Sequence, residues 1–229
     1  MTESMLLAVR FKVEGNLRFL SHAETLRLLQ RACVRAGLAL RYSEGFNPHP
    51  KLSLPLPRPV GVESDEELLC LWVEREPLPG AELDDETAGI DQQSRIMAAL
   101  ARQLPEGCTL LSVSAPETGA SFHPRSATYV LPVKQAYFSE ALKATAECLL
   151  ASDHLPLRRP MDDSGVRFKN VDVRGFLKSI KLEDGSIIAE CEIRPDGSVR
   201  VDELLRLLGL DEAALAAPIR RTNVQWKQA

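Results

Sequence analysis

The chain has 229 residues, of which 45% are hydrophobic and 26% charged, with a formal net charge of −4; this composition is ordinary for globular proteins and excludes extensive disorder. No run approaches the roughly 18 to 20 apolar residues that a membrane-spanning helix needs, and the N-terminal residues lack the pattern of a secretory signal. We therefore expect a cytoplasmic protein with no membrane partner.

The first two elements are a strand and a helix. The alternating segment 6–15 indicates the strand. Ser21 is then followed three residues later by Glu24, which forms a capping box and predicts a helix from there to about Ala36, ended by Gly37.

The two sides of this helix differ in character. Apolar positions such as Leu29 and Cys33 recur on one side at helical spacing, while Arg27, Arg31 and Arg35 recur every four residues on the opposite side and should face outward. A basic stripe of this kind is either an anion-binding surface or simply a solvated helix face, and the sequence leaves both interpretations open.

A Pro-rich stretch separates this helix from the next elements. Residues 38–64 are predicted to be an extended segment broken by a Pro-rich loop, because five prolines between residues 48 and 59 exclude a regular central strand there. A strand at 66–74, an acidic linker, a helix at 90–103 and a strand at 109–114 follow. The order β-α-β-β-α-β is that of a ferredoxin-like domain.

The segment PETGASFHPRS, residues 116–126, predicts a domain boundary because it is rich in Pro, Gly and Ser. It divides the chain into an N-terminal domain of residues 1–116 and a C-terminal domain of residues 125–229.

The C-terminal part is expected to repeat the first architecture. A strand at 127–133, a helix at 138–151, a hairpin within 171–194 that turns at residues 183–185, and a helix at 201–208 are predicted. The fold class expected for the whole chain is α+β, with two ferredoxin-like (βαββαβ-type) domains in tandem.

Charge is distributed unevenly along the chain. Residues 1–60 contain nine Lys and Arg against four Asp and Glu, whereas residues 61–120 contain three against thirteen. Neighbouring segments of opposite charge suggest a cationic face for an anionic partner. The acidic segment at residues 61–91 is interpreted either as a surface for a protein partner or as a solvated rim.

The cysteines argue against a metal site. Structural zinc and iron–sulfur sites require closely spaced thiolates, and this chain has no CxxC or CxxxC group, so no metal or other cofactor is predicted. The odd number and wide spacing favour buried free thiols. The cysteines are Cys33, Cys70, Cys108, Cys148 and Cys191.

A long, rare string lies at residues 42–53, YSEGFNPHPKLS. Together with LRFLSH at residues 17–22 and RAGL at residues 35–38, it resembles the radical SAM-linked family, a bacterial domain of unknown function associated with radical S-adenosylmethionine enzymes. Weaker features at 171–180 and 220–222 extend the resemblance over most of the chain. The family usually has Gln in place of Glu44. The resemblance implies a radical S-adenosylmethionine enzyme as partner and implies no known reaction.

The chemistry of this string permits two interpretations. Gly45 permits positive φ, and the prolines on both sides of His49 stiffen the loop, so that His49 and Lys51 would be presented at low entropic cost to a nucleobase or phosphate. Alternatively, Phe46 and Leu52 fill the core and the prolines only brace a crossover.

No nucleophile paired with a base, pair of carboxylates or Gly-rich phosphate loop is recognisable, so no catalytic residue is predicted. We expect a non-catalytic adaptor that binds or presents the substrate of a radical S-adenosylmethionine enzyme, with RNA favoured. The alternatives are a protein-binding scaffold and an RNA-processing or RNA-modifying enzyme, which would need His22, Tyr42, His49 and Lys51 in one cleft. The candidate ligand-binding residues are Arg18, His22, Arg27, Arg31, Tyr42, Asn47, His49 and Lys51.

Overall fold

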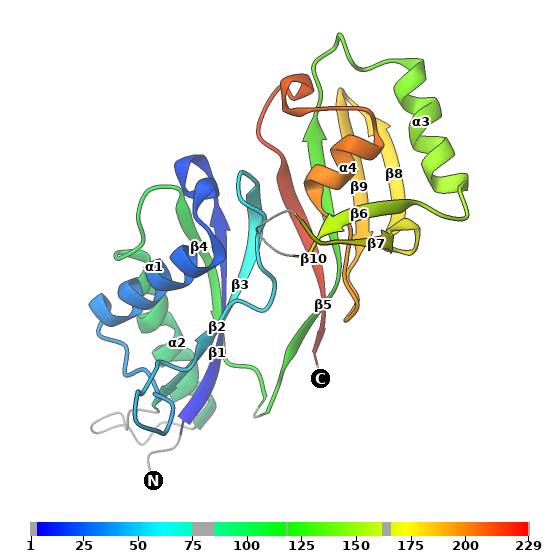
Figure 1. Ribbon diagram of the computed structural model, residues 1–229. Coiled ribbons are helices and arrows are strands. Elements are labelled where there is room, and N and C mark those ends of the chain that lie inside the picture. Colours follow the sequence, from blue (N-terminus) through cyan, green and yellow to red (C-terminus); the bar gives the residue numbers. More distant parts are fainter. Residues whose placement is uncertain (1–3, 75–84, 118, 162–165, 229) are drawn as a thin grey trace. The chain divides into compact units, whose positions relative to one another are not determined.

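The protein is an α+β protein, as predicted (Figure 1). The computed structural model describes residues 4–74, 85–117, 119–161 and 166–228. They form two compact units, Met1–His123 with Gln228–Ala229, and Pro124–Lys227. The division falls inside the Pro-, Gly- and Ser-rich segment 116–126. None of the helices in the described part of the chain is long and apolar enough to cross a membrane.

The first unit is built on an antiparallel sheet. Strand β1 (Ser4–Val13) pairs with β3 (Glu63–Glu74) on one side and with β4 (Cys108–Ser114) on the other. The two-residue strand β2 (Leu52–Ser53) pairs with β3, which gives the order β4-β1-β3-β2. The three longer strands confirm the sequence predictions.

Two helices complete the first unit, and the 3-10 helix η1 (Gly15–Phe19) precedes them. Helix α1 (His22–Arg35) begins at the predicted capping box, in which the Ser21 hydroxyl accepts from the Glu24 N–H and the Glu24 carboxylate accepts from the Ser21 N–H. Helix α2 (Asp85–Ala101) begins five residues earlier than predicted. Leu29 of α1 and Leu100 of α2 share one core with the sheet residues.

A buried arginine organises the Pro-rich segment between β2 and β3. The side chain of Arg58 donates hydrogen bonds to the carbonyl oxygens of Leu17, Arg18 and Leu20 around η1, and of Pro59 and Val62 in its own segment, at 2.6–3.4 Å. The carbonyls of Leu17, Arg18 and Pro59 also accept backbone N–H bonds, so side-chain and backbone donors together fix the loop without regular secondary structure.

The second unit has a sheet of order β10-β5-β9-β8, made of β10 (Arg220–Gln228), β5 (Phe122–Pro132), β9 (Ser186–Glu192) and β8 (Leu177–Glu183). The predicted hairpin turn is confirmed, because Asp184 and Gly185 have φ values of 48° and 73°, as a two-residue turn with positive φ at both positions requires. Strand β10 was not predicted.

The remaining elements of the second unit are two helices and a separate ribbon. Helices α3 (Glu140–Ala151) and α4 (Val201–Leu207) confirm the predictions, with ends differing by one or two residues. Between α3 and β8 the chain forms an unpredicted two-stranded sheet, β6 (Pro156–Pro160) with β7 (Phe168–Asp172), followed by the 3-10 helix η2 (Arg174–Phe176). A third 3-10 helix, η3 (Glu212–Ala214), precedes β10. The tandem ferredoxin-like arrangement stays a prediction.

Candidate functional site

The rare string forms a closed loop, here called the motif loop, residues 42–51. The backbone N–H of Ser43 donates to the His49 carbonyl at 2.8 Å, and the His49 N–H donates to the Ser43 hydroxyl at 3.0 Å. Tyr42 and Pro50 form an antiparallel bridge. The loop therefore has a defined conformation of its own, as the prolines led us to expect.

The base of the motif loop is attached to the sheet. Lys51 N–H donates to the Arg41 carbonyl at 2.7 Å, and Trp72 of β3 bonds to both segments, accepting from the Arg41 N–H at 2.8 Å and donating to the Lys51 carbonyl at 2.9 Å. Leu52 packs against the core. Backbone hydrogen bonds to β3 thus fix the position of both ends of the motif loop.

The outer part of the motif loop is exposed from Glu44 to His49. The Phe46 side chain is 104% exposed relative to its reference value, and Tyr42 is 46% exposed. The interpretation in which Phe46 fills the core is therefore wrong, whereas Leu52 does pack as that interpretation required. Full burial of a Phe side chain stabilises a fold by about 1.5–3 kcal/mol, and Phe46 makes no such contribution in the isolated chain.

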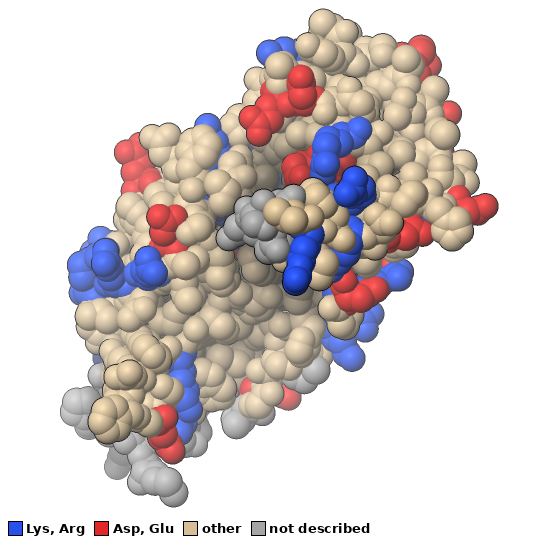
Figure 2. Space-filling view, in the orientation of Figure 1, with Lys and Arg blue, Asp and Glu red and all other residues tan. Residues whose placement is uncertain are grey.

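Among the arginines of α1, Arg27 and Arg31 are exposed as predicted. Arg35 is also exposed, but its guanidinium donates to the backbone carbonyl and side-chain oxygen of Gln103, at 2.8 and 3.2 Å, and so links α1 to the residues after α2. Figure 2 shows Lys and Arg side chains gathered over α1. The basic stripe available to a ligand is therefore shorter than the sequence indicated.

Arg18 and His22 lie at the start of α1. The Arg18 guanidinium donates to the Gly15 carbonyl at 2.8 Å and lies over the Phe19 ring, 4.3 Å from its centroid. His22 is half-buried, and its Nδ1 atom is buried without a hydrogen-bond partner among the described residues.

His22 begins α1 at the end opposite the one that leads into the motif loop, and the segment before His22 and the loop are attached to different ends of β3. Gly15 N–H bonds to the Glu63 carboxylate at one end of β3, whereas the loop bonds to Trp72 near the other end. At about 3.3 Å per residue, these attachment points are roughly 30 Å apart along the strand. Arg27 and Arg31 lie along α1. The other four candidates, Tyr42, Asn47, His49 and Lys51, share the motif loop.

The acidic segment at residues 61–91 has side chains described only to Glu74; the rest, including the predicted linker, lies outside the described side chains. In β3, Glu66 forms an ion pair with Arg10, and the Asp65 carboxylate lies 3.9 Å from the Lys12 ammonium. Two of the described acidic residues therefore balance cations of β1.

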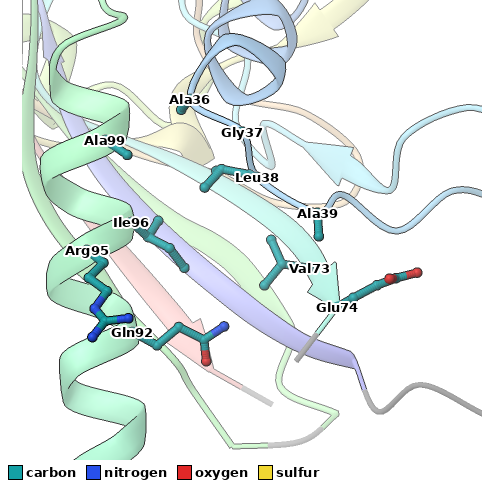
Figure 3. Close-up of a pocket in the computed structure, with 10 residues that line it drawn as sticks. All are labelled: Ala36, Gly37, Leu38, Ala39, Val73, Glu74, Gln92, Arg95, Ile96 and Ala99. Carbon is teal, nitrogen blue, oxygen red and sulfur yellow. The ribbon is translucent and has the colours of Figure 1, made fainter. Parts of the chain in front are cut away.

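A pocket of about 170 Å³ lies between α2 and the segment that follows α1 (Figure 3). Gln92 and Arg95 of α2 face the end of β3, where the pocket is lined by Val73 and Glu74. The lining contains none of the eight candidate residues. Figure 3 labels the full set, which is Ala36, Gly37, Leu38, Ala39, Val73, Glu74, Gln92, Arg95, Ile96 and Ala99.

The thiols are largely inert. Burial raises the pKa of Cys33 and Cys70 to about 11, and that of Cys108 and Cys191 to about 12, so these groups stay protonated near neutral pH. Cys148 is exposed, which differs from the prediction of buried thiols. No cluster of three or more His, Cys, Asp or Glu side chains suited to a metal occurs within the described residues.

Sequence reasoning missed a second group of exposed basic and aromatic side chains. Arg158 and Phe168, on β6 and β7, are both exposed, and the Arg158 guanidinium lies 4.5 Å from the ring centroid. The signal was present in the segments LRRP and RFK, where cations lie next to apolar residues. Prolines at both ends of β6 disfavour a strand, which masks this signal.

Comparison with known proteins gives a family. A family model described as "Uncharacterized protein conserved in bacteria (DUF2344)" matches residues 7–201, which include the motif loop, α1 and the β6–β7 ribbon. No curated protein matches the chain.

Proposed function

The chain belongs to the DUF2344 family of proteins conserved in bacteria, and we propose that it is a non-catalytic adaptor that binds or presents the substrate of a radical S-adenosylmethionine enzyme. RNA is the favoured substrate class. The choice of partner rests on the resemblance of residues 42–53 to radical SAM-linked proteins, and the choice of ligand rests on the exposed side chains of the first unit.

The observation that carries the proposal is the combination of a closed backbone and an exposed tip in the motif loop. Tyr42 and Phe46 offer aromatic rings for stacking, and His49 and Lys51 offer hydrogen-bond donors on the same loop. Stacking of a base on an aromatic ring contributes about 1–3 kcal/mol and tolerates any base sequence. A preformed loop avoids the ordering cost that a flexible loop would incur on binding.

The exposed arginines of α1 supply the electrostatic part. Arg27 and Arg31 are exposed on the helix whose far end leads into the motif loop, and cations placed along a surface contact phosphate groups without reading sequence. An enzyme that uses His22 with the loop residues is disfavoured by the roughly 30 Å estimated between the two attachment points on β3.

The tandem ferredoxin-like fold is part of this proposal. The strand orders β4-β1-β3-β2 and β10-β5-β9-β8 support it. In each unit the first strand lies between the fourth and the third, as in a ferredoxin-like domain, and β6 and β7 are an insertion in the second unit. An experimental structure with a different strand order in either unit would contradict it.

The first experiment measures binding of the purified protein to total bacterial RNA at two salt concentrations. Binding should weaken as salt rises, and the triple variant Arg27→Ala, Arg31→Ala, Lys51→Ala should bind at least about tenfold more weakly, with a smaller dependence on salt. A wild-type protein that binds no RNA at low salt would refute the RNA proposal.

A matched control removes three exposed cations from other places. The variant Arg102→Ala, Lys143→Ala, Lys181→Ala changes the net charge equally and should bind RNA as the wild type does. Equal weakening in both triple variants would mean that overall charge, and no particular surface, governs binding.

The motif loop is tested separately with His49→Ala combined with Lys51→Ala. Both changes leave the backbone hydrogen bonds in place, so the variant should keep its thermal stability and lose at most a few kcal/mol of ligand binding. His123→Ala with Lys143→Ala is the matched control at exposed positions outside the loop. Unfolding of the loop variant would instead support a structural role.

A protein-binding scaffold is the second candidate, and the exposure of Phe46 favours it. An exposed aromatic side chain on a rigid loop is typical of residues that dominate protein interfaces. Co-elution with a radical S-adenosylmethionine enzyme that is lost in Phe46→Ala, together with no RNA binding, would establish this alternative.

A further inference from the structure

The β6–β7 hairpin, here called the basic ribbon, has two distinct faces. Arg159 pairs with Lys169, and Arg158 pairs with Asn170. Because side chains alternate along a strand, Arg158 and Asn170 point away from the side on which Arg159 is buried. The ribbon thus has an outward face and an inner face, and the inner face is attached to the rest of the unit.

A buried ion pair attaches the inner face. The Arg159 guanidinium donates to both oxygens of the Glu203 carboxylate on α4, at 2.6 and 2.7 Å, and to the Ser198 carbonyl at 2.6 Å. The two side chains are only 7% and 1% exposed. Glu203 also accepts from the Arg200 N–H at 2.8 Å, so the charged groups are well satisfied.

A carboxylate fixes the end of β7. Asp172 accepts from the backbone N–H groups of Leu155 and Arg174, at 2.8 and 3.0 Å, and from His154 at 2.8 Å. The ribbon is therefore held at its middle by an ion pair and at its end by backbone donors, and its strands form a sheet separate from the main one.

The free surface of the ribbon combines cations with apolar side chains. Arg158 stacks on Phe168, which is itself 45% exposed and shares the outward face, whereas Arg167 and Lys169 alternate to the side of Arg159 and are exposed there. Figure 2 shows a concentration of Lys and Arg side chains over β6 and β7. This concentration is local, because residues 121–229 as a whole contain sixteen Lys and Arg against fifteen Asp and Glu.

We propose that the basic ribbon binds single-stranded RNA in the second unit, with Phe168 and Arg158 on the outward face as the stacking group and the exposed cations Lys169 and Arg167 on the other side of the ribbon as phosphate contacts. The inference rests on the proposed function and deepens it, because it assigns RNA contacts outside the motif loop and α1. Arginine over an aromatic ring and nearby lysine are the groups that bind single strands without sequence preference.

The observations favour RNA over a protein strand. Charged side chains along a strand edge oppose pairing with another β-strand, whereas they favour a phosphate backbone. The sequence also places Asp162 and Asp163 between the two strands. Binding should therefore depend on Arg158, Phe168 and the exposed cations beside them in the sequence more than on the summed charge of the hairpin.

The test uses the full chain and a short, fluorescently labelled single-stranded RNA of mixed sequence, with anisotropy measured at several salt concentrations. The variant Arg158→Ala, Phe168→Ala, Lys169→Ala should bind about tenfold more weakly or worse. Its log–log salt slope should be shallower by roughly 1.4 for the two cations removed. Thermal unfolding should stay at the wild-type temperature, because all three side chains are exposed.

The matched control is Tyr137→Ala, Lys143→Ala, Lys181→Ala. It removes one aromatic ring of nearly the same exposure, 43% against 45%, and two exposed cations of the same unit. Wild-type binding by this control, with weakened binding by the ribbon variant, supports the inference. Equal binding by both variants overturns it.

Failure of the inference can be separated from failure of the proposed function. Loss of binding in the Arg27, Arg31, Lys51 variant with none in the ribbon variant overturns the ribbon site and leaves the RNA adaptor standing. Loss in the ribbon variant alone supports the ribbon and overturns the assignment of RNA to the first unit. A wild-type protein that binds no RNA overturns both proposals.

Discussion

The motif loop and the basic ribbon both expose side chains outside the main sheet strands, but different interactions hold them. The motif loop is closed by its own backbone hydrogen bonds, between Ser43 and His49, and by its prolines. The ribbon depends on an ion pair between Arg159 and Glu203, residues 44 positions apart in the sequence. The shape of a projection can therefore be encoded locally or at a distance, and the two kinds should respond differently to mutation.

The largest effect is expected where the ribbon depends on a distant residue. Glu203→Ala leaves the buried Arg159 charge without its partner and should lower the free energy of unfolding by about 3–5 kcal/mol. Urea denaturation followed by circular dichroism measures this change. Asp202→Ala is the control, because its ion pair with Arg206 is exposed and contributes about 1 kcal/mol or less.

A companion variant separates charge from packing. The double change Arg159→Met with Glu203→Leu removes both buried charges and should recover most of the lost stability, since apolar replacements of buried ion pairs are often neutral. A double variant as unstable as Glu203→Ala would mean that packing, rather than an unpaired charge, explains the loss.

Acid should weaken the ribbon before the motif loop. Burial raises the pKa of Glu203, but hydrogen bonds from Arg159 and from the Arg200 N–H and the charges of both arginines outweigh it, so the net pKa lies below its usual value. The resulting stability is present above the unfolded pKa of about 4.3 and is lost as pH falls through the folded pKa.

This pH dependence is measured as the free energy of unfolding between neutral and acidic pH. In Glu203→Gln the part of the acid-induced loss that belongs to this carboxylate should be missing, and the stability curve should be flatter below the unfolded pKa. Identical slopes in the two proteins would contradict the assignment.

The prolines of the motif loop should have a smaller effect on stability. Pro48→Ala with Pro50→Ala increases the conformational freedom of the unfolded chain and should cost about 1 kcal/mol per position or less. RNA affinity should fall as well, since the loop would be ordered on binding. Urea denaturation and anisotropy measure the two effects, and unchanged affinity would show that rigidity of the loop is not used in binding.

The smallest effect on stability is expected at Phe46. Because its side chain is fully exposed, Phe46→Ala should change the free energy of unfolding by about 0.5 kcal/mol or less while weakening ligand binding. Thermal unfolding and binding assays on the same variant check both statements. A large loss of stability would mean that Phe46 packs against the protein in solution.

Local rules account for what the sequence predicted well. The Ser21–Glu24 capping box and the turn at Asp184–Gly185 depend only on residues within a few positions, and both are present. The stiffness of the motif loop was also predictable from its prolines. Its exposed Phe46 was not, because an aromatic residue in a loop is consistent with either a core or a surface position.

Longer-range contacts account for what was missed. Strand β6 was hidden by its prolines, and nothing near Arg159 in the sequence indicates Glu203 as its partner. Strand β10 lacks clean alternation of apolar and polar residues, so it was not recognised. Arg35 was assigned to a basic surface because its bond to Gln103 joins positions 68 apart.

The five carbonyl groups bound by Arg58 also bear on how the chain would be cut by a protease. Unstructured, Pro-rich segments are normally the first to be cleaved, since cleavage needs a backbone that can leave the protein surface. Residues 54–62 have that composition, yet the Arg58 side chain ties the carbonyls of Pro59 and Val62 to those around η1. Early cleavage should therefore occur in the exposed outer part of the motif loop and beside Arg167 and Lys169, and the Pro-rich segment should be cut later.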